Sequence, residues 1–231
     1  MKLAHFCLFF LFIIAFVSSC KKDSVPIVNN ASLNVINSGI GIGSIYVNRS
    51  GSSIEYYTYA DSIKYGTNEV YTLISGDAPI GITAKNDSTN ILFSGNIRLE
   101  SGGIYSLFLG GQSHISDTLF VKDNIPYLAD SLIGVRVVNL SPNSSSLSIN
   151  VQNVATPIVS SLGYKGISGF QTLTAIKPIT KYVFEARDLG GNLLASFTLN
   201  FKVFRCYTLV VGGLKGATGV NGLNIFSVSN F

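Results

Sequence analysis

The chain has 231 residues, of which 47% are hydrophobic and only 12% are charged, with a formal net charge of +4. The 16 basic residues are scattered along the chain, so the sequence lacks the basic cluster on which nucleic-acid binding depends. Gly, Ser, Thr and Asn are abundant while strong helix formers are scarce, which favours an all-β protein with many turns.

The N-terminal region predicts export and lipid attachment. Ten apolar residues, 8–17, precede the small pair Ser18 and Ser19, which is followed by Cys20. This run is too short to span a membrane as a helix, which needs about 20 apolar residues, but it has the length of a signal-peptide core. We therefore expect residues 1–19 to be a signal peptide and Cys20 to be lipidated. The alternative is an ordinary secretory signal with a chance cysteine.

The residues that follow the cysteine suit a polar tether, which we assign to 20–30. The string Ser-Cys-Lys-Lys-Asp at 19–23 resembles lipoproteins of Bacteroidetes-type bacteria. This resemblance implies a lipid-anchored protein of the bacterial cell envelope, at the periplasmic or surface face of the outer membrane. Each buried methylene of an acyl chain contributes about 0.8 kcal/mol, so two or three chains give stable membrane attachment.

The rest of the sequence contains an internal repeat. Residues 33–37 match residues 135–139, and residues 105–111 match residues 207–213, both at an offset of 102. Three further blocks match in the same order, namely 71–73 with 171–173, 82–85 with 184–187, and 92–94 with 194–196. The repeat predicts two tandem domains, 31–122 and 132–231, joined by a linker at 123–131.

Each half of the repeat contains short strand-like runs separated by turn residues. The first half predicts strands at 33–37, 44–48, 70–75, 80–85, 91–99 and 104–109. The second half predicts strands at 134–140, 147–152, 171–175, 181–187, 193–201 and 206–211. Turn signals lie at 75–79, 86–90 and 188–192. Strands at this spacing, in units of about 100 residues, predict two antiparallel β-sandwiches of immunoglobulin-like type.

Three segments of the second half carry a family resemblance. They are Val-Arg-Val-Val-Asn-Leu-Ser-Pro-Asn at 135–143, Tyr-Lys-Gly at 164–166, and Tyr-Thr-Leu-Val-Val-Gly-Gly at 207–213. They resemble the domain-of-unknown-function family numbered 4397. The first half departs from that pattern at 38–43, where a Gly-rich run replaces the Ser-Pro turn. The resemblance implies tandem β-sandwich units in envelope lipoproteins, and it implies no known activity.

The residues that most enzymes use are scarce. Without the signal peptide the chain has one histidine, His114, and two cysteines, Cys20 and Cys206. A histidine-based catalytic triad needs a positioned imidazole, and a zinc site needs a cluster of ligands. We interpret His114 as a loop residue and Cys206 as a buried apolar residue. We therefore expect no catalytic residue, no metal and no cofactor.

A tyrosine-rich stretch in the first half is the candidate ligand surface. It contains Tyr56, Tyr57, Tyr59 and Tyr65, and the second half has no equally rich match. Aromatic rings on an exposed sheet face can stack on sugars, whereas the alternative is that these tyrosines simply pack a strand.

Five of the eight aspartates begin a triplet in which Ser or Thr is followed by an apolar residue or Thr. The triplet resembles the O-glycosylation site of exported Bacteroidetes proteins. The possible acceptor residues are Ser24, Ser62, Ser88, Thr118 and Ser131. The alternative is that Asp-Ser and Asp-Thr are good turn formers, and both interpretations stay open.

These observations predict a non-catalytic binding or structural module of the cell envelope. One alternative is a surface protein that binds or hydrolyses glycans, and another is a subunit of an outer-membrane surface assembly. The expected partners are the membrane, through the lipid anchor, and a glycan or another envelope protein. No nucleic-acid partner is expected.

Overall fold

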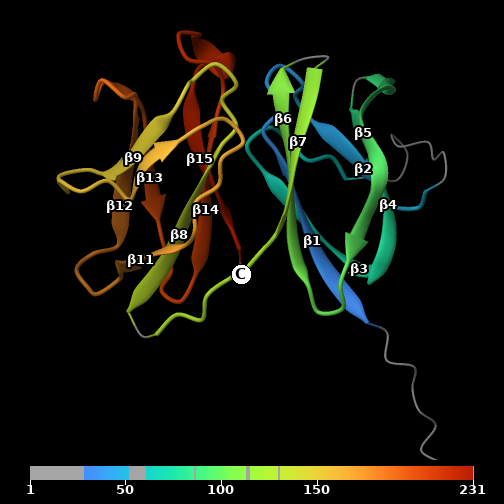
Figure 1. Cartoon of the computed structure of the whole chain (residues 1–231), viewed down its shortest axis with the longest axis horizontal. Helices are drawn as coiled ribbons and strands as arrows, with labels where there is room; N and C mark the ends of the chain where they lie inside the picture. Colours follow the sequence, from blue (N-terminus) through green and yellow to red (C-terminus); the bar gives the residue numbers. More distant parts are fainter. Residues whose placement is uncertain (1–28, 52–60, 86, 113–114, 130, 231) are drawn as a thin grey trace, which may run out of the picture.

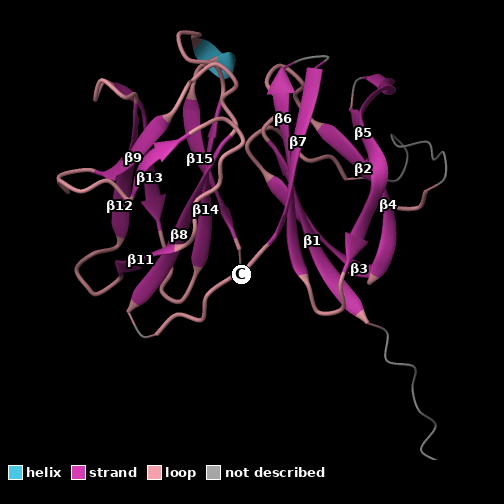
Figure 2. Ribbon diagram, in the orientation of Figure 1, coloured by secondary structure: helices cyan, strands magenta, loops and turns pink. Residues whose placement is uncertain are grey.

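A computed structural model describes residues 29–51, 61–85, 87–112, 115–129 and 131–230. Within these ranges strands dominate, and the only helical element is a short 3-10 turn at Gly219–Asn221 (Figure 2). The predicted all-β fold is confirmed. The reason lies in the sequence, where short apolar runs alternate with Gly, Ser, Asn and Asp turns.

The first half of the chain forms two sheets that pack face to face (Figure 1). Its strands are β1 Asn30–Asn37, β2 Ile45–Asn48, β3 Asn68–Ile74, β4 Gly76–Ala84, β5 Asp87–Leu99, β6 Ile104–Gln112 and β7 Ile115–Lys122. One sheet has the order β3-β1-β6-β7 and the other has the order β2-β4-β5.

The second half has the same arrangement with one more strand. Its strands are β8 Leu132–Asn139, β9 Leu147–Val151, β10 Val159–Leu162, β11 Gln171–Thr174, β12 Lys181–Arg187, β13 Leu193–Asn200, β14 Cys206–Gly212 and β15 Asn224–Ser229. The order β11-β8-β14-β15 corresponds to β3-β1-β6-β7, and β10-β9-β12-β13 corresponds to β2-β4-β5 with β10 added at the edge. The predicted β-sandwich architecture is therefore present in both halves.

One strand pair in each half departs from the predicted antiparallel pattern. β1 pairs with β6 in parallel, with Ser32 opposite Ile104. β8 pairs with β14 in parallel, with Gly134 opposite Cys206. Both partners shift by 102 residues between the halves, so the two sheets share one register. These central strands are buried on both faces, as is usual for parallel pairs.

Two details of the predicted repeat differ in the structure. The predicted turn at 75–79 is shorter, because β4 already begins at Gly76 and Pro79 lies inside it, paired with Asn96. The sequence match of 92–94 with 194–196 also differs from the structure, because the strand pairing of the second half is shifted by two residues from that match. Ile82 faces Phe93, but its counterpart Phe184 faces Phe197. A shift of two residues keeps every side chain on its original face, so the core tolerates it.

Each sandwich has its own apolar core between its two sheets. The first core includes Leu33, Ile82 and Leu107, and the second includes Val135, Phe184 and Leu209. In β9 the exposure alternates from buried to half-buried along Leu-Ser-Ile-Asn-Val, as expected for a strand with one face in a core.

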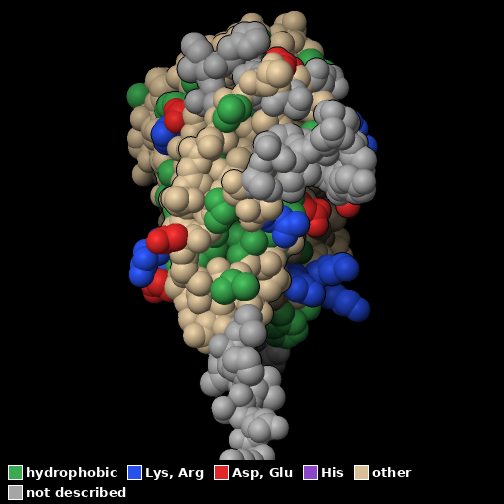
Figure 3. Space-filling view, turned by 90° about the vertical axis from the view of Figure 1, so that its right-hand side faces the viewer, with side chains coloured by type: hydrophobic (Ala, Val, Ile, Leu, Met, Phe, Trp, Pro, Cys, Tyr) green, Lys and Arg blue, Asp and Glu red, His purple; other side chains and the backbone are tan. Residues whose placement is uncertain are grey.

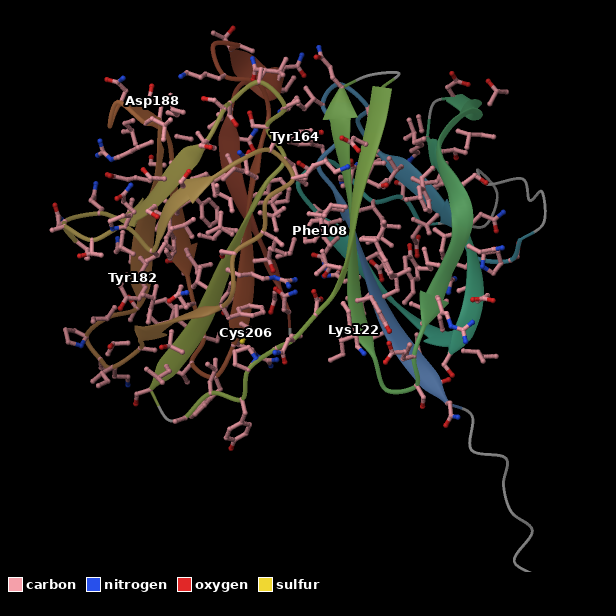
Figure 4. The ribbon with its side chains drawn as sticks, in the orientation of Figure 1. Phe108, Lys122, Tyr164, Tyr182, Asp188 and Cys206 are labelled. Carbon is pink, nitrogen blue, oxygen red and sulfur yellow. The ribbon has the colours of Figure 1, made fainter. Side chains whose placement is uncertain are left out.

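A third apolar cluster joins the two sandwiches. It contains Ile36 and Phe108 from the first half, and Val138, Leu140, Val210 and Val228 from the second. Figure 4 shows Phe108 between the two halves. Ile36 corresponds to Val138, and Phe108 to Val210, at the repeat offset of 102. Both sandwiches therefore bury the same face, as the subunits of a twofold dimer do. We call this contact the seam.

A buried ion pair lies inside the seam. The guanidinium of Arg136 is 2.7 Å from the carboxylate of Asp123, and these side chains are only 4% and 1% exposed. Arg136 also donates to Thr208 Oγ1 at 2.8 Å, and the Ser106 hydroxyl donates to Asp123 Oδ2 at 2.7 Å. The Arg136 guanidinium lies 4.9 Å from the centre of the Phe170 ring. These contacts compensate the cost of removing both charges from water.

The seam affects how the predicted division into two domains is interpreted. In the described chain, strand pairing stays within 30–122 or within 132–229. Asp123, the first residue of the predicted linker, is held in the seam. The two halves thus share an apolar cluster and an ion pair, and their division into independent domains stays a prediction.

We predict that Arg136→Met strongly destabilises the chain, because it leaves the Asp123 carboxylate buried without its cation. The expected loss is about 3–5 kcal/mol in the free energy of unfolding, measured by urea denaturation. The matched control is Arg98→Met. It breaks the pair of Arg98 with Asp77, whose side chains are 80% and 65% exposed, and should cost at most about 1 kcal/mol. Equal effects of the two substitutions would show that the seam pair does not stabilise the fold.

Candidate functional site

The tyrosine-rich stretch is only partly within the described residues. Tyr56, Tyr57 and Tyr59 lie outside them. Tyr65 is described, and it is half-buried at the seam. Its ring is 6.0 Å from that of Phe226, and its hydroxyl accepts a hydrogen bond from Asn224 Nδ2 at 3.1 Å. Burial raises the pKa of Tyr65. Tyr65 therefore contributes to the contact between the sandwiches.

Next to the predicted stretch, the structure shows a second aromatic feature. Arg49 follows β2 and places its guanidinium over the ring of Tyr71 in β3, 4.4 Å from the ring centre. The Tyr71 ring is half-buried and packs against the first core. Arg49 itself is exposed. The pair holds a planar cation and an aromatic ring at the surface, a contact favoured by the negative face of the ring.

Two carboxylates complete this surface. Burial raises the pKa of Tyr71, nearby Arg49 opposes that rise, and the negative charges of Glu69 and Asp61 add to it. Glu69 lies two residues before Tyr71 in β3 and therefore on the same face of the strand, and the side chains of Glu69 and Asp61 are both exposed. We call Arg49, Asp61, Glu69 and Tyr71 the Tyr71 surface. Residues 52–60, with the other three tyrosines, connect Arg49 to Asp61 in the sequence.

The chemistry of the Tyr71 surface suits a ligand with many hydroxyl groups. Carboxylates accept hydrogen bonds from hydroxyls, and a guanidinium donates to their oxygens. An aromatic ring offers apolar area beside these polar groups. Figure 3 shows the adjoining face of the first sandwich, where hydrophobic side chains gather between basic and acidic ones. Tyr71 was not selected from the sequence as a candidate ligand residue. The repeat could have indicated it, because the corresponding position of the second half is Gln171, so the fold does not require an aromatic residue there.

Asp117 links the sandwiches beside the candidate glycosylation residue Thr118. It lies in β7 and accepts hydrogen bonds from Lys165 Nζ at 2.7 Å and from the Tyr164 hydroxyl at 3.1 Å. Figure 4 shows Tyr164 at the boundary between the halves. Burial and the Asp117 charge raise the pKa of Tyr164 to about 12. The Asp117 triplet thus has a structural role, while the half-buried Thr118 stays a predicted acceptor.

The other predicted acceptor residues lie apart from one another. Ser24 and the side chain of Ser88 are outside the described residues. Ser62 is half-buried, with its hydroxyl 3.5 Å from Lys85 Nζ. Ser131 is half-buried at a positive φ of 65°, and its carbonyl accepts from the Ala175 N–H. Glycosylation at these sites stays a prediction.

Cys206 is buried, as predicted. Burial raises the pKa of its thiol, which disfavours the reactive thiolate. Opposite it, a side chain at Gly134 would place its Cβ 2.7 Å from the sulfur, so this close packing needs glycine. Cys20 and His114 lie outside the described residues.

Six of the described carboxylates are engaged in ion pairs. The pairs are Asp77–Arg98, Glu100–Lys122, Asp117–Lys165, Asp123–Arg136, Glu185–Arg187 and Asp188–Lys215. A nearby cation favours the ionised carboxylate, which suits a structural contact better than proton donation. The described residues contain no group of three or more His, Cys, Asp or Glu that could hold a metal ion. Across the same part of the chain, no helix is long and apolar enough to cross a membrane.

Comparison with known proteins gives only distant likenesses. No family model and no curated protein matches the chain by sequence. Among solved structures, streptococcal family 41 carbohydrate-binding modules that recognise alpha-glucan align with a TM-score of 0.28 and 11% identity, covering 85% of this chain and 96% of that one. A candidate adhesin from Bacteroides ovatus aligns with a TM-score of 0.24 and 10% identity, covering 87% and 92% of the two chains. Such low scores assign no role to any residue here.

We predict that Asp117→Asn removes an acid-sensitive part of the stability. Burial tends to raise the pKa of Asp117, but hydrogen bonds from Lys165 and Tyr164 outweigh it and lower the pKa below 3.8. The carboxylate therefore stabilises the fold above its unfolded pKa, and this contribution is lost as the pH falls through the lower folded value. When the pH is lowered from neutral to strongly acidic, the melting temperature of the native chain should fall further than that of the Asp117→Asn variant. Parallel losses would show that the contact does not couple to pH.

Proposed function

We propose that this chain is a lipid-anchored protein of a bacterial cell envelope and acts as a non-catalytic binding module. Its ligand surface is the Tyr71 surface, and Tyr56, Tyr57 and Tyr59, which lie outside the described residues, stay predicted members of it. A glycan is the class of ligand that this chemistry favours. The observation that carries the proposal is the Arg49 guanidinium held over the Tyr71 ring, with two carboxylates nearby.

Membrane attachment is supported by the order of segments in the sequence. A signal-like apolar core, two small residues and Cys20 are followed by a short polar segment. β1 begins at Asn30, ten residues after that cysteine. An extended chain of ten residues spans at most about 36 Å, so lipid on Cys20 would keep the sandwiches near the bilayer.

A binding role is supported by the rigidity of the scaffold. The seam fixes the two sandwiches against each other with an apolar cluster and a buried ion pair. Tyr71 is held in β3, which pairs with β1 along seven residues. Its ring is thus positioned without a ligand, which lowers the entropy cost of binding.

Lipid attachment predicts a clear result for Cys20→Ala. We expect it to abolish labelling of the chain with radioactive palmitate and to release the chain from the membrane fraction in carbonate. Cys206→Ala is the matched control and should leave both measurements unchanged, because its thiol is buried in the second sandwich. Unchanged labelling of Cys20→Ala would exclude this cysteine as the lipidated residue.

Glycan binding predicts that Tyr71→Ala and Arg49→Ala weaken retardation of the chain in gels that contain soluble xylan, mannan or glycogen. A loss of about tenfold in affinity corresponds to about 1.4 kcal/mol. The control is Tyr127→Ala, which removes a fully exposed tyrosine from the linker. Release of reducing sugar by the native chain would instead indicate hydrolysis, with Asp61 and Glu69 as the first carboxylates to replace. No retardation in any of these gels would contradict the glycan proposal.

A further inference from the structure

Exposed apolar and basic side chains occur together at the end of the second sandwich that lies lowest in Figure 1. This end is formed by residues 123–129 of the linker, by residues 175–181, which connect β11 to β12 and include the first residue of β12, and by residues 201–205 between β13 and β14. We call these three segments the basal loops. Their exposed apolar residues are Tyr127, Ile176, Ile179, Val203 and Phe204. Exposed apolar side chains grouped in this way indicate a contact surface.

The two basal loops outside the linker also concentrate positive charge. Residues 175–181 and 201–205 contain no acidic residue. Their four cations are exposed, namely Lys177, Lys181, Lys202 and Arg205. None of the four forms an ion pair with another described residue. Their charge is therefore available to an anionic partner.

The first sandwich shows that the fold itself does not require these residues. Its turn at 100–103 has the sequence Glu-Ser-Gly-Gly, and the corresponding turn at 202–205 has Lys-Val-Phe-Arg. Both turns are built alike. The N–H of Glu100 donates to the Tyr105 hydroxyl at 2.9 Å, and the N–H of Lys202 donates to the Tyr207 hydroxyl at 2.8 Å. The same backbone thus carries different side chains in the two halves.

The clearest difference is at Phe204. Its φ is 63°, and its counterpart Gly102 has a φ of 72°. Glycine adopts this left-handed region without steric cost, whereas a bulky residue there is strained. Phe204 nevertheless occupies the position, and half of its surface stays exposed, at 52%. An exposed aromatic ring at a position suited to glycine is better explained by an external contact than by folding.

The charge at this end also differs between the halves. In the first sandwich Glu100 pairs with Lys122, and Asp77 pairs with Arg98, so these charges compensate each other. The second sandwich keeps four cations without such compensation. An apolar surface surrounded by cations matches the boundary of a membrane with anionic headgroups, where the phosphates meet the acyl chains.

The position of the N-terminal strand supports the same partner. β1 begins at Asn30 at the lower end of the molecule in Figure 1, and Cys206, labelled in Figure 4, begins β14 at that end. We infer that the basal loops of the second sandwich dock on an anionic phospholipid membrane, with Phe204 and Tyr127 at the headgroup boundary. The inference rests on the proposed lipid attachment, because the anchor turns this end of the molecule toward the bilayer.

The chain contains no tryptophan, which makes a direct test possible. Phe204→Trp introduces a single fluorescent reporter in the basal loops, and Tyr127→Trp introduces one at a fully exposed position of the linker. Val220→Trp is the matched control, because Val220 is exposed in the 3-10 turn at the opposite end (Figure 1). The full-length chain, purified from membranes, is bound to vesicles of phosphatidylcholine and phosphatidylglycerol that contain brominated lipid.

We expect brominated lipid to quench the indoles of the Phe204→Trp and Tyr127→Trp variants several-fold more than that of Val220→Trp. Reversing Lys202 and Arg205 to Glu should weaken this contact by about fivefold for each cation. The matched charge control reverses Lys64 and Lys85, exposed lysines next to the upper ends of β3 and β4, and should have no such effect. Equal quenching in all three variants would overturn the inference. So would quenching that stays the same after Lys202 and Arg205 are replaced by Glu.

The two proposals can fail separately. The mass of the N-terminal peptide reports whether Cys20 carries lipid, while quenching reports whether the basal loops touch the bilayer. A lipidated chain in which neither basal-loop variant is quenched keeps the anchor and excludes docking. A chain without lipid that still shows quenching in the anionic vesicles excludes the anchor and keeps the basal loops as a membrane contact.

Discussion

The buried pair of Arg136 and Asp123 constrains the rest of the molecule. Both charges are almost completely removed from water, and a buried charge without its partner costs several kcal/mol. The pair therefore holds Asp123, which directly follows β7, against β8 of the second sandwich. Around it, the apolar side chains of the seam bring corresponding faces of the two halves together. The apolar cluster and the ion pair thus hold the two sandwiches, which are linked by a short peptide, in one arrangement relative to each other.

The duplication supplies an internal comparison at each position. Both halves keep the parallel pairing of their central strands, the core residues and the hydrogen bond from a turn N–H to a tyrosine hydroxyl. Where they differ, the shared fold cannot be the reason. Asn34 in β1 corresponds to Arg136, Tyr71 corresponds to Gln171, and Gly102 corresponds to Phe204. These three differences place the ion pair in the seam, an aromatic surface on the first sandwich and an exposed ring on the second.

Much of the fold could be predicted because its signals are local. Alternation of apolar residues identified most strands within a few residues, and the repeat predicted that both halves share one architecture. The sequence does not predict β7, β10 and β15, because β10 is short and polar, and β7 and β15 carry Ser, Asp, Thr or Asn among their apolar residues. The parallel pairing was missed because it joins strands that are distant in sequence. Tyr65 was grouped with its neighbours Tyr56, Tyr57 and Tyr59, although its hydroxyl contacts Asn224 in the other half.

The sequence by itself determined the all-β class, the duplicated units and the buried state of Cys206, and it carries the prediction that Cys20 is lipidated. Each of these depends on local composition, periodicity or spacing, which the chain carries before it folds. Only the tertiary structure decided which faces of the sandwiches meet, which cation neutralises Asp123, and which aromatic residues remain exposed. Those outcomes depend on contacts between residues far apart in sequence, such as Arg136 with Ser106 and Tyr65 with Phe226. No local pattern records such contacts, because each partner has an ordinary strand or loop environment until the two halves pack together.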